Sequence, residues 1–484
     1  MRKTLLAATA LFLGFASEAQ WLPQNPGFTA DTVNIYELSL PDKNTAWGVA
    51  FDWNAGLLGN RGSLSFTRTT DGGNTWTAGK MGSDKTIKFS NISAIDGQEA
   101  WVAMHKIGPV GGNYNVGPQG AITYGGGIYH TTDGGVNWEK TNPGELFNEN
   151  SVPRFVHFKD KNHGIAVGDP NGGYFEIYLT NNKGKKWKRV AEHKIPAPLA
   201  GEHAWLSGYA VIGNTIWFGT DKGRMFKSED FGQTWTVVMV EPIPGTHVHE
   251  IAFLDDGLTG VAHLRHPATF RVFVYSTLDG GLTWTNYFQP ANWKSSRMTA
   301  VPGTHAFVST SVDQRQQFTG SSVSYDAGKT WAQIERTGSK AACRFYDATT
   351  GYAGGLHVTG HPTFGNRGIF KSEIVFEMPE ATNNAVSART AKKPAVEQAK
   401  SVNEAALKVY PNPAKDAITV VLPKAVVAEG VASIYGLDGK LLKSTKLSGA
   451  STIRLDVSGL QSGVYTLRIA TKTGILNKLI TVAK

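Results

Sequence analysis

The feature that most constrains the fold is an eight-residue segment that recurs six times along the chain. Its copies read Ser/Thr-x-Asp-x-Gly-x-x-Trp, with asparagine replacing the aspartate once. The acidic or amide position falls at Asp71, Asp133, Asn182, Asp230, Asp279 and Asp326, so successive copies are 62, 49, 48, 49 and 47 residues apart. A repeat of roughly 40–50 residues is typical of propeller blades, each a small antiparallel sheet. The spacing therefore predicts a β-propeller.

Each residue type in the segment has a structural use. The aspartate accepts hydrogen bonds from its own turn, glycine adopts the positive φ that such a turn needs, and tryptophan packs between neighbouring sheets. The segment resembles the Asp-box (BNR) repeat, which marks the turn between the third and fourth strands of a blade. This resemblance implies that the six residues are structural and lie away from the substrate face. We expect no metal and no cofactor.

Between the boxes, the sequence shows short strands with turn signals and almost no helical periodicity. The third repeat, for example, is predicted to contain strands at 154–158, 164–167, 174–180 and 187–190. After Trp331 there is room for a seventh unit, but no Gly-x-x-Trp follows Ser372. Trp21, ahead of the first repeat, supplies the missing residue. We therefore predict an all-β, seven-bladed propeller whose last blade is closed by an N-terminal strand, since closure removes exposed sheet edges.

Both ends of the chain differ from this central region. Residues 1–19 have the basic start, short apolar run and small terminal residues of a signal peptide. That run is too short to span a bilayer and no later stretch is long enough, so we expect no transmembrane segment. Residues 378–406 lose aromatic side chains and are predicted to be a flexible linker. The predicted domains are the signal peptide 1–19, propeller 20–377, linker 378–406 and a C-terminal domain 407–484.

The C-terminal segment has its own pattern of alternating strands and tight turns. Strands are expected at 417–422, 432–435, 440–442, 452–456, 463–469 and 478–482, which predicts a small β-sandwich. The segments VYPNPAKDAITV, IYGLDGKLL and LDVSGLQSGVYTLRI closely resemble the type IX secretion sorting domain of Bacteroidota. This resemblance implies export by the type IX machinery, removal of the tail by a sortase, and attachment to surface lipopolysaccharide or release. An adhesive or carbohydrate-binding sandwich is the alternative.

The formal net charge of +9 is concentrated in this tail. Residues 407–484 contain eleven basic and four acidic residues, whereas the charges of residues 20–377 balance. A balanced propeller lacks the electrostatic basis for binding nucleic acid, so we expect no such partner. The single Cys343 excludes an intramolecular disulfide.

Ligand-binding residues are expected on one face of the propeller. The loops between blades and those joining second to third strands share this face, here called the entry face, and the boxes lie opposite. Candidates at the starts of first strands are Arg154, His249, Glu250, Arg297 and, slightly out of register, Arg344. Candidates in or near the inner loops are Asp52, Asp169, Asp221, Asp313, His263, His266, His357 and His361. Clustered arginines would bind a carboxylate or sulfate, and a histidine with a carboxylate would serve as general base and acid.

The step of 62 residues between the first two boxes indicates an insertion in residues 105–127. It is glycine-rich and contains Tyr114 and Tyr124. We consider two interpretations, an adaptable wall over the channel mouth and an ordinary surface loop.

The propeller resembles two groups of proteins. One is the sialidase-like superfamily, although its Arg-Ile-Pro segment does not occur here. The other is the seven-bladed WD40/YVTN/BNR-like group of photosystem II assembly factors, which residues 161–173 (KNHGIAVGDPNGG) resemble. We expect a secreted or cell-surface propeller that binds an acidic glycan or a protein on its channel face. The alternatives are a glycan-degrading enzyme, either glycoside hydrolase or polysaccharide lyase, and a protein-assembly scaffold.

Overall fold

The computed structural model describes residues 20–29, 33–52, 64–82, 87–106, 126–142, 146–148, 151–241, 243, 245–266, 268–269, 271–287, 289–312, 319–336, 338–355, 368–376, 408–422, 429–436, 441–448, 451–471 and 474–483. The predicted signal peptide and linker lie outside these residues. So do the candidates Tyr114, Tyr124, Asp313, His357 and His361.

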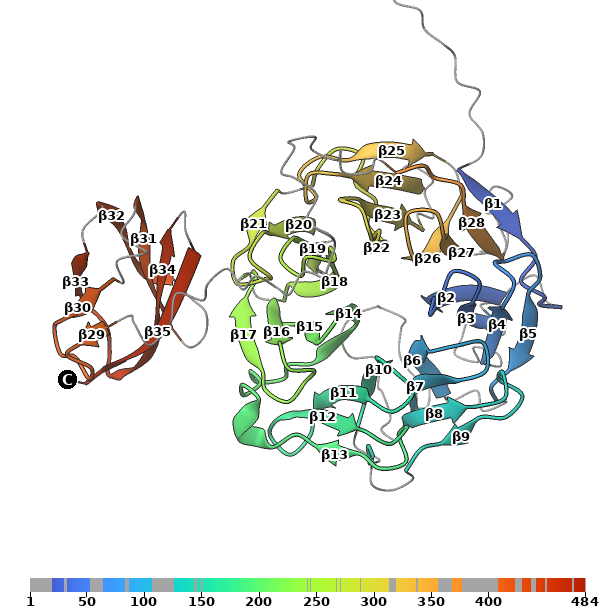
Figure 1. The fold of residues 1–484 in the computed structure, drawn as a ribbon, viewed down its shortest axis with the longest axis horizontal. Coiled ribbons are helices and arrows are strands. Elements are labelled where there is room, and N and C mark those ends of the chain that lie inside the picture. The colour runs from blue at the N-terminus through green and yellow to red at the C-terminus, as the bar shows by residue number, and fades with distance from the viewer. Residues whose placement is uncertain are drawn as a thin grey trace, which may run out of the picture. The chain divides into compact units, whose positions relative to one another are not determined.

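The described residues of the N-terminal region form seven four-stranded antiparallel sheets, arranged as the blades of a propeller around a central axis (Figure 1). From the innermost strand outward, blade 1 contains β2 (Val33–Ser39), β3 (Ala46–Asp52), β4 (Ser65–Thr69) and β5 (Thr77–Lys80); blade 2 contains β6 (Ile87–Ala94), β7 (Ala100–Lys106), β8 (Gly127–Thr131) and β9 (Glu139–Lys140); and blade 3 contains β10 (Pro153–Phe158), β11 (Gly164–Pro170), β12 (Phe175–Thr180) and β13 (Lys188–Arg189). In the same order, blade 4 contains β14 (Ala204–Ile212), β15 (Thr215–Thr220), β16 (Arg224–Ser228) and β17 (Thr236–Met239), and blade 5 contains β18 (His247–Phe253), β19 (Gly260–His266), β20 (Arg271–Thr277) and β21 (Thr285–Asn286). Blade 6 contains β22 (Arg297–Ala300), β23 (Phe307–Ser311), β24 (Gly320–Ser324) and β25 (Ala332–Glu335), and blade 7 contains β26 (Lys340–Phe345), β27 (Gly351–Gly355), β28 (Ile369–Ser372) and β1 (Trp21–Gln24).

Blade 7 is closed by the N-terminal strand, which confirms the prediction from Trp21. Strand β1 pairs antiparallel with β28, with Trp21 opposite Ser372. The Trp21 side chain is 3% exposed, and its indole Nε1 donates to Ser321 Oγ of blade 6 at 3.0 Å. Its ring lies 5.9 Å from that of Phe345. Strand β1 therefore joins the two ends of the propeller sequence (Figure 1), and its Trp21 side chain contacts the neighbouring blade 6.

Tryptophans fill the space between adjacent blades. Trp47 on β3 is fully buried, with its ring 5.5 Å from Phe66 of its own blade and 6.2 Å from Trp138 of the second box. Trp101 on β7 stacks face to face on Phe158 of blade 3, with the ring centroids 3.6 Å apart. These large buried rings anchor sheet to sheet by the apolar area that they remove from water.

The box turns keep their acidic groups within the turn. In the first box, Asp71 Oδ1 accepts the backbone N–H of Thr75 at 3.0 Å and Asp71 Oδ2 accepts the Thr75 hydroxyl at 2.6 Å. Thr69 Oγ1 donates to Asp71 Oδ1 at 2.8 Å and accepts the N–H of Gly73, whose φ is 86°. Hydrogen bonds, first from the side chain and backbone of Thr75, lower the pKa of Asp71 to about 2. The same arrangement recurs at Asp133, Asn182, Asp230, Asp279 and Asp326.

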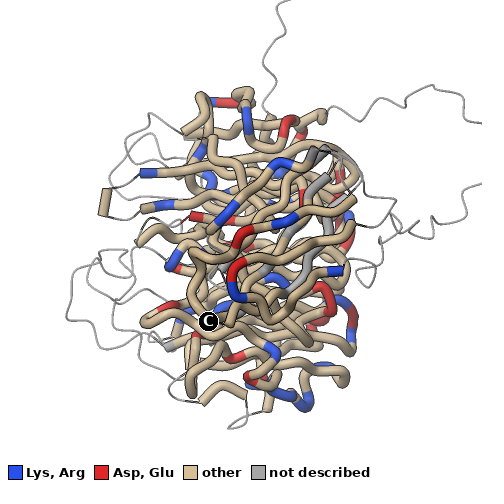
Figure 2. The backbone as a smooth tube through the Cα atoms, turned by 90° about the vertical axis from the view of Figure 1, so that its left-hand side faces the viewer, with Lys and Arg blue, Asp and Glu red and all other residues tan. Residues whose placement is uncertain are grey.

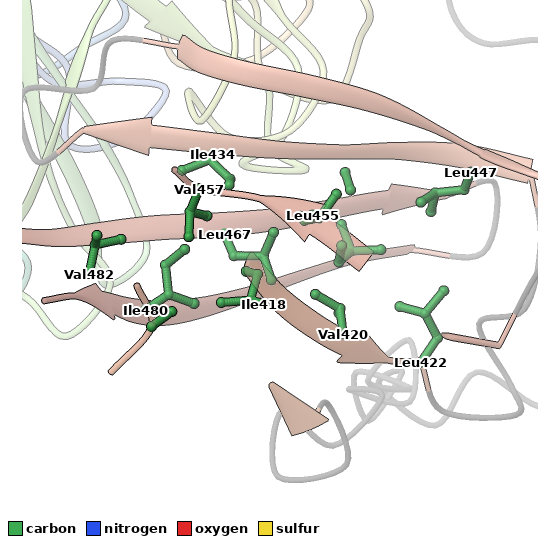
Figure 3. Packing of buried hydrophobic residues seen from close by; sticks show 13 residues of the cluster. Ile418, Val420, Leu422, Ile434, Leu447, Leu455, Val457, Leu467, Ile480 and Val482 are labelled. Atoms are coloured by element: carbon green, nitrogen blue, oxygen red, sulfur yellow. The ribbon is translucent and has the colours of Figure 1, made fainter. Parts of the chain in front are cut away.

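The C-terminal region forms two further antiparallel sheets, as predicted for a small β-sandwich. One contains β29 (Lys408–Tyr410), β30 (Ala417–Val421) and β33 (Thr452–Asp456), and the other has the order β32 (Leu441–Ser448), β31 (Glu429–Gly436), β34 (Gly463–Thr471) and β35 (Gly474–Val482). Alternate residues of β30 point inward, and Ile418 and Val420 meet Ile434, Leu467 and Ile480 from the second sheet (Figure 3). The resulting core is entirely aliphatic and buried.

Along the backbone of the described residues, lysine and arginine are interspersed with aspartate and glutamate (Figure 2). No helix within the described ranges is both long and apolar enough to cross a membrane.

Candidate ligand-binding site on the entry face

The innermost strands share an irregularity near their first residues. Pairing with the next strand shifts register in β2, β6, β10, β14, β18 and β26. In β10 and β18, the shifts fall between Pro153 and Phe155 and between Val248 and Glu250, so that Arg154 and His249 are the bulged residues. A bulge leaves one residue unpaired and re-aims its side chain. Arg154 and His249 therefore occupy equivalent positions in their blades.

In blade 5, the residue after the bulge is the charged Glu250. Arg297 of blade 6 and Ala342 of blade 7 are at the equivalent position, because each of the three lies three residues before the residue that pairs with the first residue of the next strand. Arg344 is two residues further along β26, which places it out of register with Arg297 as expected from the sequence.

The charges at this level of the channel pair with one another. Arg297 Nη1 lies 2.5 Å from Glu250 Oε1, and Arg297 Nε donates to the Ala341 carbonyl at 2.8 Å. Arg344 Nη2 donates to Glu37 Oε1 of blade 1 at 2.8 Å. Glu250 is 1% exposed and Arg297 is 5% exposed. One ion pair thus joins blades 5 and 6, and the other joins blades 7 and 1. In each pair, the negative charge of the glutamate neutralises the positive charge of the arginine inside the propeller.

The pKa shifts of this group follow from burial and pairing. Burial raises the pKa of Glu250, while the positive charges of Arg297 and Arg344 act in the opposite direction. Burial would lower the pKa of Arg297, but the charges of Tyr36, Glu250 and Glu37 outweigh it and raise the pKa. We conclude that Arg297 stays charged and that Glu250 is held within its ion pair rather than presented to a substrate.

On the other side of the channel, polar and aromatic side chains from blades 2, 3 and 4 interlock. Asn91 Nδ2 donates to the Val156 carbonyl at 2.8 Å and to the Tyr209 hydroxyl at 3.0 Å. The Tyr209 ring stacks on Phe155 at 4.5 Å. These contacts join blades 2, 3 and 4 through the side chains of their innermost strands.

Arg154 and Asp169 form a third buried ion pair. Arg154 Nε donates to Asp169 Oδ1 at 2.7 Å, and Arg154 Nη2 binds Asp169 Oδ2 in the same forked arrangement. Asp169 Oδ1 also accepts the backbone N–H of Ala204 at 3.0 Å, at the start of β14. This pair fixes the entry of the chain into blade 4, so its guanidinium fork is occupied by protein groups.

A histidine and an aspartate form an oriented pair beside it. His203 Nδ1 lies 3.1 Å from Asp221 Oδ2, and the backbone N–H of His203 donates to Asp221 Oδ1 at 2.9 Å. The hydrogen bond with Asp221 raises the pKa of His203, although burial opposes it. The side chain of Asp221 is 4% exposed and that of His203 is 32% exposed. The aspartate is thus the buried orienting group and the histidine is the accessible one.

Further aromatic and basic groups surround this pair between blades 4 and 5. We define the mouth cluster as His203, Trp205, Asp221, Lys222 and His247. The ring of Trp205 lies 4.5 Å from that of His247. Burial lowers the pKa of His247, and the nearby charges that act on it are those of Asp221, Lys222, His266 and Arg265. The cluster residues lie at or next to the starts of β14 and β18 and the end of β15, which is the entry face.

Two candidate histidines lie deeper. His263 is fully buried, and neither of its ring nitrogens has a hydrogen-bond partner among the described residues. The His249 ring lies 5.1 Å from His263 and 5.5 Å from Trp205. Burial lowers the pKa of His263 to about 3 and holds that of His249 well below its usual range. Within the described ranges, no three histidine, cysteine or acidic side chains group in a way that could hold a metal ion.

Among the described residues, the structure pairs four of the sequence candidates with one another, as Arg154 with Asp169 and Arg297 with Glu250. Arg154, Asp169, Glu250 and Arg297 are in internal ion pairs, and ligand-binding roles for them stay predictions. Sequence reasoning missed His203, Trp205 and Lys222. Their signal was the segment Glu202-His203-Ala204-Trp205 at the start of a strand, with an aspartate eighteen residues after the histidine.

The C-terminal domain matches a known family. Residues 408–482 match the model of the secretion system C-terminal sorting domain. This match indicates export by type IX secretion to the cell surface or beyond.

Several solved structures are similar to this chain at low sequence identity. Similar chains include YCF48 bound to a D1 peptide, with 17% identity over 74% of this chain and 98% of that chain and a TM-score of 0.45. YCF48 from Cyanidioschyzon merolae has 16% identity over 73% and 98%, with a TM-score of 0.46. A sialidase from Trypanosoma rangeli has 10% identity over 95% and 86%, with a TM-score of 0.41. The search of curated proteins returned no match.

Proposed function

We propose that this exported propeller binds an anionic extracellular ligand, an acidic glycan or an acidic protein segment, at the mouth cluster. The observation that carries the proposal is the His203–Asp221 pair on the entry face. Its Nδ1–carboxylate contact leaves Nε2 of His203 to donate to a ligand. The raised pKa of His203 favours the protonated, anion-binding form.

The surroundings of His203 support the same ligand chemistry. Lys222 adds a positive charge one residue after Asp221. Trp205 is partly exposed and offers an aromatic face beside these charges. A carboxylate or sulfate next to a sugar or peptide plane matches this combination of charge and aromatic surface. The channel arginines contribute less, since Glu250 and Glu37 already neutralise them.

The proposal is tested by calorimetric titration of the full chain with polygalacturonate, chondroitin sulfate and poly-glutamate. Lys222→Ala is expected to weaken binding of the preferred probe at least about fivefold, the size of one lost charge contact. Lys185→Ala, an exposed lysine in the third box on the opposite face, is the matched control and should leave binding unchanged. Equal affinities for both variants would place the ligand elsewhere.

The second candidate function is a polysaccharide lyase, which the His203–Asp221 geometry favours over a hydrolase. In a lyase, the neutral imidazole would remove the C5 proton of a uronate, the electrons of that C–H bond would form the C4–C5 double bond, and the C4–oxygen bond would break. The leaving oxygen would take its proton from the imidazolium so formed. Asp221 would orient the histidine and stabilise its charged form. The measurement is ultraviolet absorbance of unsaturated products, which His203→Gln should abolish.

The outcomes separate three classes of protein. Binding without product supports the binding protein, product supports the lyase, and the absence of both supports a protein-assembly scaffold.

The proposal also includes how the exported chain is processed. We propose the domain boundaries 1–19, 378–406 and 407–484, removal of the tail by a sortase, and attachment of the protein to the cell surface or its release. They are tested by N- and C-terminal sequencing of the exported protein.

A further inference from the structure

A cleft with a volume of about 520 Å³ lies between the closing strand β1 and the first box. It is lined by Pro23, Gln24, Asn25, Gly27, Gly73, Asn74, Thr75 and Trp76. The cleft is built where the N-terminal segment passes from blade 7 to blade 1, with Thr67 Oγ1 donating to the Pro26 carbonyl at 2.6 Å. It is on the side of the box turns and is therefore separate from the mouth cluster.

The tryptophan of this box departs from the arrangement that four of the other five boxes share. In four boxes, the indole Nε1 donates to the carbonyl of the box glycine, at 2.9–3.1 Å. Trp76 Nε1 instead points to Gln24 Oε1 of β1, at 3.3 Å. Its ring is held edge-on against Tyr352, with the ring centroids 5.4 Å apart. The closing strand and the first box thus present one partly exposed indole ring at the wall of the cleft.

The polar groups around this indole are amides and hydroxyls. Gln24, Asn25, Asn74 and Thr75 line the cleft, and no lining residue carries a formal charge. Asn25 Oδ1 accepts the N–H of Gly27, so its amide nitrogen is the group it can offer to a ligand. The Tyr352 hydroxyl is buried without a hydrogen-bond partner among the described residues. It lies against Gly73, where an added Cβ would come within 2.9 Å of it.

We propose that this cleft is a binding site for a neutral saccharide. Side-chain amides both donate to and accept from sugar hydroxyls, and an indole face packs against the apolar C–H face of a sugar ring. An anionic ligand is disfavoured, because the Asp71 carboxylate lies directly behind Thr75, whose hydroxyl it binds at 2.6 Å. The volume of the cleft accommodates one or two sugar residues.

The test uses the indole N–H signals of the ¹⁵N-labelled full chain, titrated with xylohexaose, cellohexaose and mannohexaose. The chain contains 13 tryptophans, and the signal of Trp76 is assigned by its loss in Trp76→Phe. At least one of these neutral probes is expected to shift the Trp76 signal in a saturable manner. The signal of Trp205, at the mouth cluster, should stay unchanged, which separates this site from the proposed anion site.

A pair of matched variants distinguishes the cleft from general damage to a box. Asn74 Nδ2 donates to the Asp71 carbonyl at 2.7 Å, and Gln233 Nε2 makes the same contact with Asp230 in the fourth box at 3.0 Å. Asn74→Ala should weaken binding at least fivefold, whereas Gln233→Ala should not change it. The proposal is overturned if no probe shifts the Trp76 signal, if many tryptophans shift equally, or if both variants weaken binding alike.

Discussion

At the scale of single residues, the stability of the channel depends on paired buried charges. Glu250→Gln would keep the shape of the side chain but leave Arg297 without its anionic partner. Because an unpaired buried charge is costly, we expect the free energy of unfolding to fall by about 3 kcal/mol. The measurement is chemical denaturation followed by tryptophan fluorescence. That signal reports on the propeller alone, since every tryptophan precedes residue 332.

The control for this prediction removes both charges together. Glu250→Met combined with Arg297→Met should cost less than the sum of the two single changes, because neither charge is then left unpaired. Additive costs would show that the two side chains contribute independently and that the ion pair does not hold blades 5 and 6 together.

Buried histidines should make the propeller sensitive to acid. Burial lowers the pKa values of His105 and His263 to about 3, whereas an unfolded histidine titrates near 6.5. The unfolded state therefore binds more protons as the pH falls through that interval, and stability is lost from about pH 6.5 downward. At pH 5 the loss is about 2 kcal/mol for each histidine.

Replacement of one of these histidines tests the cause. His263→Leu should reduce the fall in the free energy of unfolding between pH 7 and pH 5, measured in urea by tryptophan fluorescence. An unchanged difference between the two pH values would mean that His263 is protonated as readily in the folded protein as in the unfolded chain.

At the scale of secondary structure, the closing strand is the element on which the ring depends. Trp21 is 3% exposed, whereas Leu22, its neighbour in β1, is 41% exposed. Trp21→Ala should lower the free energy of unfolding by about 3–5 kcal/mol, as for other large buried aromatic residues. Leu22→Ala, which keeps the strand but removes an exposed side chain, should cost less than 1 kcal/mol. Similar costs for the two variants would argue against a buried, closing Trp21.

The strands could be read from the sequence because their signals are local. The box turn fixes the end of each third strand, and the period-two pattern then places the others, as for 154–158 and 164–167. The predicted strand 154–158 begins one residue after the first residue of β10. That end of β10 carries the bulge, where alternation is interrupted and pattern reading fails.

At the scale of the whole molecule, the two folded regions predict a division of labour. A chain that lacks residues 408–484 should remain inside a host that has type IX secretion, whereas the full chain reaches the surface or the medium. Fractionation with an antibody against the propeller measures this. Export of the shortened chain would show that the sorting domain is dispensable.

The candidate site was less predictable than the fold, for a physical reason. Its pairs join residues that are distant in sequence, such as Arg344 with Glu37 and Arg297 with Glu250. The pattern placed Arg297 and Glu250 near the channel, but the spacing of residues does not show which charges neutralise each other. His203 escaped notice because it ends a long connection between blades, where no repeat pattern marks its position.

The central claim is that a protonated His203 on the entry face helps to bind an anionic ligand. The most direct test is the dissociation constant of the full chain for its preferred anionic probe between pH 6 and pH 9. Because Asp221 raises the pKa of His203, affinity should be high at pH 6 and fall about fivefold as His203 loses its proton. His203→Gln should bind weakly and without this pH dependence. A wild-type affinity that is constant with pH and equal to that of His203→Gln would contradict the account.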